Sequence, residues 1–197
     1  EEIQHWRELL ADIESAADCS AVAIDEYAPS RELADAAFAA AFTRRGIPSP
    51  FEQKAVVTAL STLPAGIRQT ISAAIDRCAN HETQKAIERF DLATAILASP
   101  PAWRMALRRL NESENVESLR QLIADSELHS EALTSTFYVN CINALRRWTT
   151  IEEALAVSER ARNRFLNDYA LHLQAAELHW SMTPRQQDRA EDSLRAA

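Results

Sequence analysis

Glycine is nearly absent from this sequence, which holds only Gly46 and Gly66 among its 197 residues. Glycine supplies the left-handed backbone positions on which β-hairpins, strand turns and phosphate-binding loops depend. Those devices are therefore largely excluded. Ala, Leu, Glu and Arg, which are good helix formers, dominate instead. The composition predicts an all-α protein.

Cysteines and long apolar runs are also scarce. The three cysteines, Cys19, Cys78 and Cys141, fit neither a disulfide framework nor a zinc-ligand spacing, which suggests a reducing or neutral compartment. No apolar run approaches the roughly 20 residues that a membrane-spanning helix needs. We therefore expect an intracellular protein without a membrane partner. Because the chain begins at Glu1 and not at Met, we expect a fragment or processed form of a longer chain.

Signatures of catalysis are missing as well. The sequence has no G-x-S-x-G, no glycine-rich phosphate loop and no Cys–His pair close in sequence. The pair Glu152-Glu153 falls in the first turn of a predicted helix, where capping and the helix dipole explain it. His172 and His179 lack the i, i+4 spacing of metal ligands, so we interpret them as partly buried histidines with local hydrogen bonds. We predict no catalytic, cofactor or metal site, and keep an all-α enzyme with a scattered site as an alternative.

Negative charge gathers at one end of the chain. The net charge is −8, and residues 1–35 hold ten carboxylates against Arg7 and Arg31, so the remainder is balanced. A balanced remainder gives no whole-domain attraction to nucleic acid. The acidic segment would suit a basic protein partner or serve as a polar cap.

Helix starts are legible because capping patterns recur. In "SPFE" (49–52), "TPRQ" (183–186) and "TTIEE" (149–153), a Ser or Thr precedes the helix and a Glu or Gln stands three residues on. Together with the 3.6-residue periodicity, these signals predict about 10–11 helices in antiparallel hairpins, with residues 19–29 as the least certain stretch. The predicted helices cover 2–18, 30–45, 50–62, 64–79, 82–98, 101–110, 114–126, 132–148, 150–165, 168–181 and 184–196.

The helix over 137–148 has two unlike sides. At 100° per residue, its aromatic residues, Trp148 among them, share one arc with all of its aliphatic residues except Val139. The opposite arc, which we expect to be open, carries Asn140, Asn143, Arg146 and Arg147, joined by Val139. The helix over 168–181 is apolar on two sides, which predicts a helix packed between neighbours. This pattern favours a stack of hairpins over a closed bundle, with Trp148 and Trp180 on buried stripes.

A repeat is visible in the second half of the chain. The segment "ALRRL" (106–110) recurs as "ALRRW" (144–148), and Trp180 follows Trp148 at a similar interval. These spacings average about 35 residues, the period range of tetratricopeptide-type hairpins. We therefore divide the chain into an N-terminal helical region (1–100) without an evident period and a repeat region (101–197), with one continuous α-solenoid as the other option.

The stretch "FYVNCINALRRWTTIEEALAVSERA" resembles one pentatricopeptide repeat, with the best match over residues 136–161. It has an aromatic start, "INAL" in the first helix and "EEAL" opening the second, a pattern that tetratricopeptide repeats share in large part. The resemblance implies a right-handed solenoid with the first helices lining a groove. It also implies a mitochondrial location, with the cytoplasm as the alternative, and a role in binding single-stranded RNA or within a ribonucleoprotein such as the mitochondrial ribosome. Val139 occupies the position that usually carries a base-reading Asn, Ser or Thr, which speaks against base reading.

Three arginine pairs, 44–45, 108–109 and 146–147, fall near predicted helix C-termini. Cations there complement the helix dipole, which is our preferred interpretation. Stacked in register, the last two pairs would form a basic stripe that binds phosphates or an acidic peptide. The candidate partner or RNA-binding residues are Arg108, Arg109, Asn140, Asn143, Arg146 and Arg147.

The first functional hypothesis is a non-catalytic helical-repeat scaffold or adaptor that mediates protein–protein contacts. Direct binding of single-stranded RNA is the second, and the enzyme is the third. Salt dependence separates the first two hypotheses. A pocket with convergent titratable groups would indicate the third.

Overall fold

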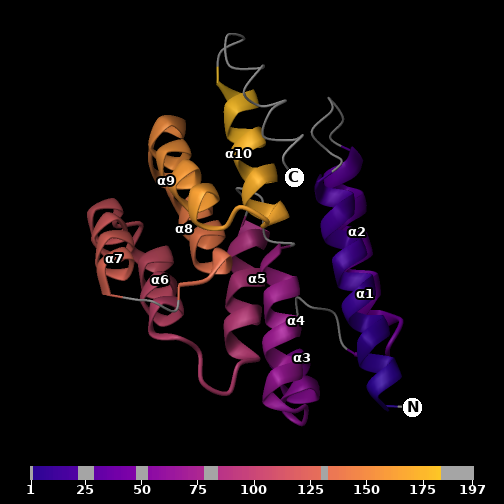
Figure 1. Ribbon diagram of the computed structural model, residues 1–197. Helices are drawn as coiled ribbons and strands as arrows, with labels where there is room; N and C mark the ends of the chain where they lie inside the picture. The colour runs from indigo at the N-terminus through magenta and orange to yellow at the C-terminus, as the bar shows by residue number, and fades with distance from the viewer. Residues whose placement is uncertain (1, 22–28, 48–52, 78–83, 130–132, 183–197) are drawn as a thin grey trace. The chain divides into compact units, whose positions relative to one another are not determined.

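The computed structural model describes residues 2–21, 29–47, 53–77, 84–129 and 133–182. Over these residues the chain forms ten α-helices and no strand, which confirms the all-α prediction for this part (Figure 1). The helices are α1 (Glu2–Ala21), α2 (Pro29–Thr43), α3 (Gln53–Ser61), α4 (Ala65–Arg77), α5 (Gln84–Ala95), α6 (Ala102–Ser113), α7 (Val116–His129), α8 (Ser135–Trp148), α9 (Ile151–Arg164) and α10 (Tyr169–Ser181).

Several predicted features lie outside the described residues. They are the helix over 184–196, the capping patterns over 49–52 and 183–186, and residues 22–28 of the uncertain stretch. Among the helices that are described, none combines the length and the apolar character that crossing a membrane requires.

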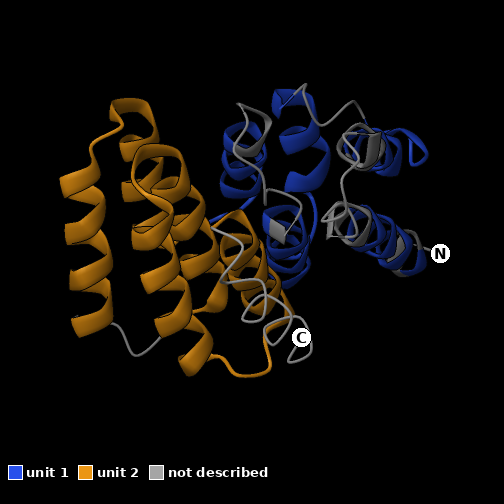
Figure 2. Cartoon of the chain, turned by 90° about the horizontal axis from the view of Figure 1, so that it is seen from above, with its two compact units in different colours: residues 1–100 blue, residues 101–197 orange. Residues whose placement is uncertain are grey.

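The chain divides into two compact units, residues 1–100 and residues 101–197, which Figure 2 distinguishes by colour. In the first unit, α1 packs against α2 and α4, while α5 packs against α4 and α3. Fully buried aliphatic and aromatic residues from all five helices form its core, and Phe38 meets Phe42 edge-on at 5.3 Å between ring centroids. The core members at most 1% exposed include Leu9, Ile13, Phe38, Phe42, Val56, Leu60, Ile71, Ile75, Leu92 and Ile96.

One of the two glycines ends α2. Gly46 has a φ of +66°, the left-handed conformation that side chains disfavour. The amide of Ile47 donates to the carbonyl oxygen of Phe42 at 3.1 Å, and the amide of Gly46 donates to that of Thr43 at 3.0 Å. This is a Schellman ending, in which the apolar residue after the glycine folds back onto the helix. Ile47 is accordingly buried.

Arginines engage part of the acidic N-terminal segment. Arg45 pairs with Asp12 at 2.9 Å and with Glu8 at 3.6 Å, which joins the end of α2 to α1. Arg89, only 5% exposed, pairs with Asp35 and lies 4.6 Å above the ring of Phe38. These described carboxylates thus have cationic partners within the unit, which weakens the expectation that residues 1–35 serve a basic partner.

The second unit is built from consecutive helical hairpins. Neighbouring helices pack in the order α6 with α7, α7 with α8, α8 with α9 and α9 with α10, and α8 also contacts both α6 and α10. Two ion pairs with equal sequence spacing connect α7 to α9: Arg120 with Glu153, and Glu127 with Arg160. Since the first pair joins the starts of both helices and the second joins their later turns, α7 and α9 run parallel in register.

Candidate functional site

Helix α8 has no open side, so the expected open face is wrong. Every residue from Phe137 to Leu145 is buried, including Val139, Asn140 and Asn143, which are 3%, 5% and 6% exposed. The helix contacts α6, α7, α9 and α10, which surround it. The asparagines predicted to face RNA are therefore interior residues.

The buried amides of α8 form hydrogen bonds within the unit. Gln174 of α10 donates from Nε2 to Asn143 Oδ1 at 2.7 Å and to the Val139 carbonyl at 3.3 Å. Asn140 donates to the Thr136 carbonyl, one turn earlier in its own helix, at 2.9 Å. Such bonds offset the cost of removing amides from water. Gln174 was not predicted from the sequence, although its distance along the chain from Asn143 is close to the expected repeat length.

The two arginines at the end of α8 are also engaged. Arg146 pairs with Glu177 of α10 at 2.9 Å, and both side chains are at most 15% exposed. Arg147 donates to Asn111 Oδ1 of α6 at 2.9 Å and lies over the ring of Trp148. The arginines connect neighbouring hairpins and lie in the last helical turn, where the dipole favours cations.

Arg108 and Arg109 differ from the other predicted residues. Helix α6 continues to Ser113 instead of ending at residue 110, so neither arginine lies in its last turn. Arg109 is exposed and Arg108 is half-buried. The structure therefore does not bring the six predicted residues together on one accessible stripe. Arg109 is the single exposed residue among the six.

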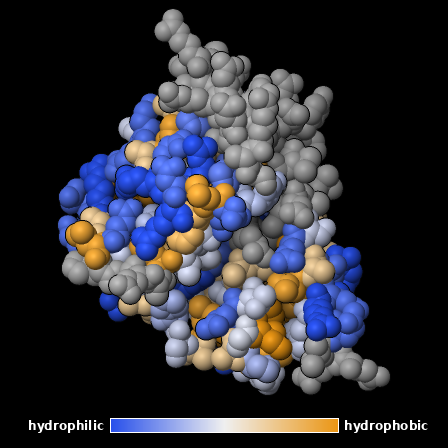
Figure 3. All heavy atoms as spheres, in the orientation of Figure 1, coloured by the Kyte–Doolittle hydropathy of each residue, from blue (hydrophilic) through white to orange (hydrophobic). Residues whose placement is uncertain are grey.

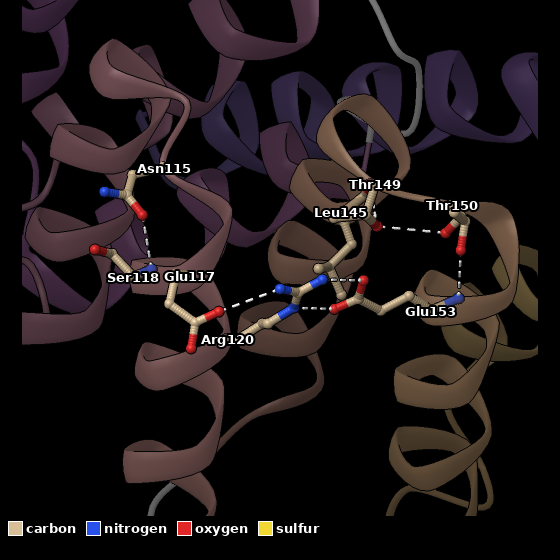
Figure 4. Close-up of polar contacts among 8 residues, drawn as sticks. All are labelled: Asn115, Glu117, Ser118, Arg120, Leu145, Thr149, Thr150 and Glu153. Carbon is tan, nitrogen blue, oxygen red and sulfur yellow. Dashed lines mark hydrogen bonds and ion pairs between the residues drawn. The ribbon is translucent and has the colours of Figure 1, made fainter.

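The start of α9 shows one half of the predicted capping box (Figure 4). The Thr150 hydroxyl accepts from the Glu153 amide at 3.4 Å, as predicted. The Glu153 carboxylate instead accepts from Arg120, at 2.7 Å from Nε and 2.9 Å from Nη2, and Arg120 also reaches Glu117 at 3.2 Å. The hydrogen bonds from Arg120 lower the pKa of Glu153 below its ordinary value. The Glu153 carboxylate therefore connects α9 to α7 at the surface and does not cap its own helix.

The two histidines are more buried than predicted, and the hydrogen bond of His172 is local whereas that of His179 reaches the neighbouring helix α9. His172 is 5% exposed and donates from Nε2 to the Leu166 carbonyl at 2.8 Å. His179 is 2% exposed, and its Nε2 lies 2.9 Å from Glu159 Oε1. No group of three or more potential metal ligands occurs among the residues that the structure describes.

Trp148 and Trp180 are less buried than predicted. Trp148 is half-buried, and Trp180 is 42% exposed at the end of α10, so the assignment of Trp180 to a buried stripe is wrong. Trp103 packs edge-on against the fully buried Phe137, with ring centroids 5.4 Å apart. The aromatic row continues from Phe137 to Tyr138 and from there to Phe165.

This row ends at the turn between α9 and α10. Burial and the negative charge of Glu127 raise the pKa of Tyr138, while a hydrogen bond and the positive charge from Arg164 lower it, and the net direction is upward. The Tyr138 hydroxyl thus lies between the last turns of α7 and α9. Residues 164–168 line an open hollow of about 480 Å³ at this turn.

One exposed apolar side chain, Leu166, lines the hollow, and two others lie at the ends of the adjoining helices α10 and α7. Leu166 is 66% exposed, Tyr169 is 52% exposed, and Leu128, which follows Glu127 at the end of α7, is 76% exposed. In the view of Figure 3, hydrophobic residues of the described chain form small separate groups among hydrophilic ones. The exposed leucine of this turn was not predicted from the sequence, where its signal was a leucine within the polar turn "RFLND".

Comparison with protein-family models, with curated proteins and with solved structures gave no match to this chain. The resemblance to pentatricopeptide and tetratricopeptide repeats consequently stays a prediction.

Proposed function

We propose that this chain is a non-catalytic helical scaffold that holds partner proteins on the surface of stacked helical hairpins. The observation that supports it most is the use of the polar residues of α8 inside the fold. Asn143 bonds Gln174 and Arg146 bonds Glu177, both across 31 residues, so the side chains that could have read a nucleic acid connect α8 to α10 instead.

The same contacts support a repeat. In a stack of equivalent hairpins, a residue lies beside its counterpart one repeat later. The α8–α10 contacts have a spacing of 31 residues, the α7–α9 contact of Arg120 has 33, and the α6–α8 contact of Arg147 has 36. These values surround the 34-residue length of tetratricopeptide hairpins. An α-solenoid with pentatricopeptide-like or tetratricopeptide-like units is therefore part of the proposal.

A scaffold of this kind acts by its shape. Each hairpin adds surface without changing the core of its neighbours, which suits it to several simultaneous protein contacts. The setting that we propose, from the resemblance over 136–161, is a mitochondrial ribonucleoprotein such as a ribosome or an assembly intermediate of one. In such an assembly the chain would contact proteins, and RNA would be held by its partners.

The experiment is purification of the tagged chain from cells that make it naturally, with and without ribonuclease treatment. Protein partners that stay bound after the RNA is digested support the scaffold. Partners lost upon digestion would show that RNA carries the association. The ribonucleoprotein setting would be supported if the tagged chain sediments with large particles, and if ribonuclease makes these particles smaller without releasing the chain from its protein partners.

Direct RNA binding is tested separately by fluorescence anisotropy with labelled single-stranded RNA of mixed sequence. We expect no binding at about 50 mM salt, since phosphate contacts supply most of the affinity in such complexes and only Arg109 of the six predicted residues is exposed. Binding that weakens linearly with the logarithm of salt, and that falls in the variant Arg108→Gln/Arg109→Gln, would favour the RNA hypothesis instead.

A further inference from the structure

We propose that the turn between α9 and α10 is a docking site for an acidic peptide segment of a partner protein, anchored by a large apolar side chain. The site comprises Arg164, Leu166 and Tyr169, with Leu128 at its margin, and is called the α9–α10 turn site below. The proposal rests on the proposed scaffold function and specifies the chemistry of one partner.

The exposure of its apolar residues is the first argument. Leu128, Leu166 and Tyr169 are all more than half exposed. Large apolar side chains outside a core are commonly contact residues when they gather beside a hollow. Here Leu166 lines the hollow of about 480 Å³, and Tyr169 directly follows Asp168, another of its lining residues.

The residues lie at one end of the second unit. Glu127 pairs with Arg160 at 3.5 Å, and its carboxylate acts on Tyr138 together with the guanidinium of Arg164. The last turn of α7 is therefore beside the last turn of α9. Leu128 follows Glu127 directly, and Leu166 comes two residues after Arg164, so both belong to this end.

The charges at this end favour an acidic partner. Arg160 is paired with Glu127, and Arg162 is paired with Glu159 at 2.6 Å. No described carboxylate lies within ion-pair distance of Arg164, whose partners are neutral groups, the ring of Phe165 and the Tyr138 hydroxyl. An exposed arginine without a carboxylate offers two parallel donors to a carboxylate of the partner.

The nearest acid at the turn is occupied. Asp168 caps α10, where its Oδ1 accepts from the Leu171 amide at 3.2 Å. Its negative charge faces the positive end of the helix dipole, which offsets it. Arg164 therefore remains the group that an incoming charge meets beside the exposed leucine.

The shape of the hollow selects the class of ligand. Sites for small molecules enclose most of the ligand surface, whereas this hollow is shallow and open. A peptide can place one side chain in it and lie across the flanking leucines. A nucleic acid would require several phosphate contacts, and the turn provides one cation that has no described carboxylate within ion-pair distance. An acidic peptide with an apolar anchor is the ligand that fits both properties.

The test uses the full chain and fluorescein-labelled decapeptides as probes. Each decapeptide carries one Leu, Phe or Trp among positions that are all acidic, all neutral or all basic. We expect binding of the acidic set in preference to the neutral and basic sets. Arg164→Gln is expected to weaken this binding about 10-fold, the usual effect of losing a charge-assisted hydrogen bond.

Leu166→Ser is expected to weaken binding by a similar factor through loss of apolar contact. Arg109→Gln, which removes an exposed arginine from α6, is the matched control and should leave binding unchanged. Both positions of the site are at the surface, so the variants should unfold at the same temperature as the parent chain. If either variant unfolds at a different temperature from the parent chain, Leu128→Ser is used in its place to test peptide binding.

Absence of peptide binding, equal binding of the three sets, or equal weakening by Arg109→Gln would overturn the site. Mixed-sequence RNA that binds and is lost with Arg164→Gln would reassign the turn to nucleic acid. If the double variant Arg164→Gln/Leu166→Ser keeps every ribonuclease-resistant protein partner, the site is wrong and the scaffold function stands. If the parent chain has no such partner, the scaffold function itself fails.

Discussion

Arg120 donates to both carboxylate oxygens of Glu153, a residue 33 positions later in the chain, and in this way connects α7 to α9. The contact is at the surface, where ion pairs are screened by salt and contribute little individually. Its importance is geometric. Together with the Glu127–Arg160 pair, it shows the register in which the two helices lie.

This pair gives stability a definite pH dependence. The pKa of Glu153 is lower in the folded chain than its ordinary value because Arg120 donates hydrogen bonds to the carboxylate. The pair therefore stabilises the fold at pH values above the ordinary glutamate pKa, and this contribution disappears as the pH falls through the lowered pKa.

We expect Glu153→Gln to be less stable than the parent chain at pH 7, with a difference that shrinks on acidification and in high salt. Urea unfolding at several pH values measures it. Glu152→Gln, an exposed neighbour in the same helical turn, is the control for the helix dipole. An equal pH dependence in both variants would contradict a specific role of Arg120.

The Asn143–Gln174 contact predicts an unusual mutational pattern. Asn143→Leu leaves the buried amide of Gln174 with one weaker acceptor, and should cost about 1–3 kcal/mol in the free energy of unfolding. The double variant Asn143→Leu/Gln174→Leu should recover part of that loss, because both polar partners are then removed together. Denaturant unfolding of the three variants tests this. Additive losses would mean that the two amides do not depend on each other.

Two residues with positive φ should respond in opposite directions. Gly46→Ala is expected to destabilise by about 1 kcal/mol, since its φ of +66° is unfavourable for a side chain. Glu114, which ends α6 with a φ of +50°, already bears that strain. Glu114→Gly should therefore raise the unfolding temperature slightly. Unfolding temperatures that shift in opposite directions would confirm that both residues have a left-handed backbone. Shifts in the same direction would contradict this.

The aromatic residues should rank by burial. Phe137→Ala removes a fully buried ring between Trp103 and Tyr138 and is expected to cost about 3–5 kcal/mol. Trp148→Ala should cost less, and Trp180→Ala least, because their rings are half-buried and 42% exposed. Chemical denaturation gives the three values. A loss for Trp180→Ala as large as for Phe137→Ala would place the end of α10 inside a core.

Cys141 should be inert in the folded chain. It is fully buried as a free thiol, and burial raises its pKa well above the ordinary value, so little reactive thiolate forms. In a chain with Cys19 and Cys78 replaced by Ser, a thiol reagent should label Cys141 only as fast as the protein unfolds. Rapid labelling under native conditions would show that α8 is accessible.

Sequence patterns predict the helices better than their faces. The scarcity of glycine and the capping residue Thr150 indicate helices and where one begins. The polar arc of α8 was wrongly assigned to the solvent-exposed surface, because the polar side of a helix considered alone is assumed to face water. In the structure, Gln174 and Glu177 of α10 contact this polar side in place of water. Each lies 31 residues after its partner in α8, a spacing that becomes informative only when the two helices are known to run in register.

The α9–α10 turn shows a second limit. Leu166 stands in a polar turn, where a single apolar residue is ordinary and attracts no attention. Its meaning depends on Arg164, whose neighbours Arg160 and Arg162 have carboxylate partners while it has none among the described residues. Which arginine is neutralised depends on the positions of Glu127 and Glu159 in space, and their order in the chain does not contain that information.

The contacts that connect the hairpins of residues 101–182 also determine how this unit can acquire its structure. The side-chain contacts between helices described above join residues that are 20–36 positions apart, from His179–Glu159 to Arg147–Asn111. Chains whose contacts are close in sequence lose little entropy on closing each loop and fold fast. Each hairpin can therefore add to the preceding one as it leaves the ribosome, without waiting for a distant segment to arrive.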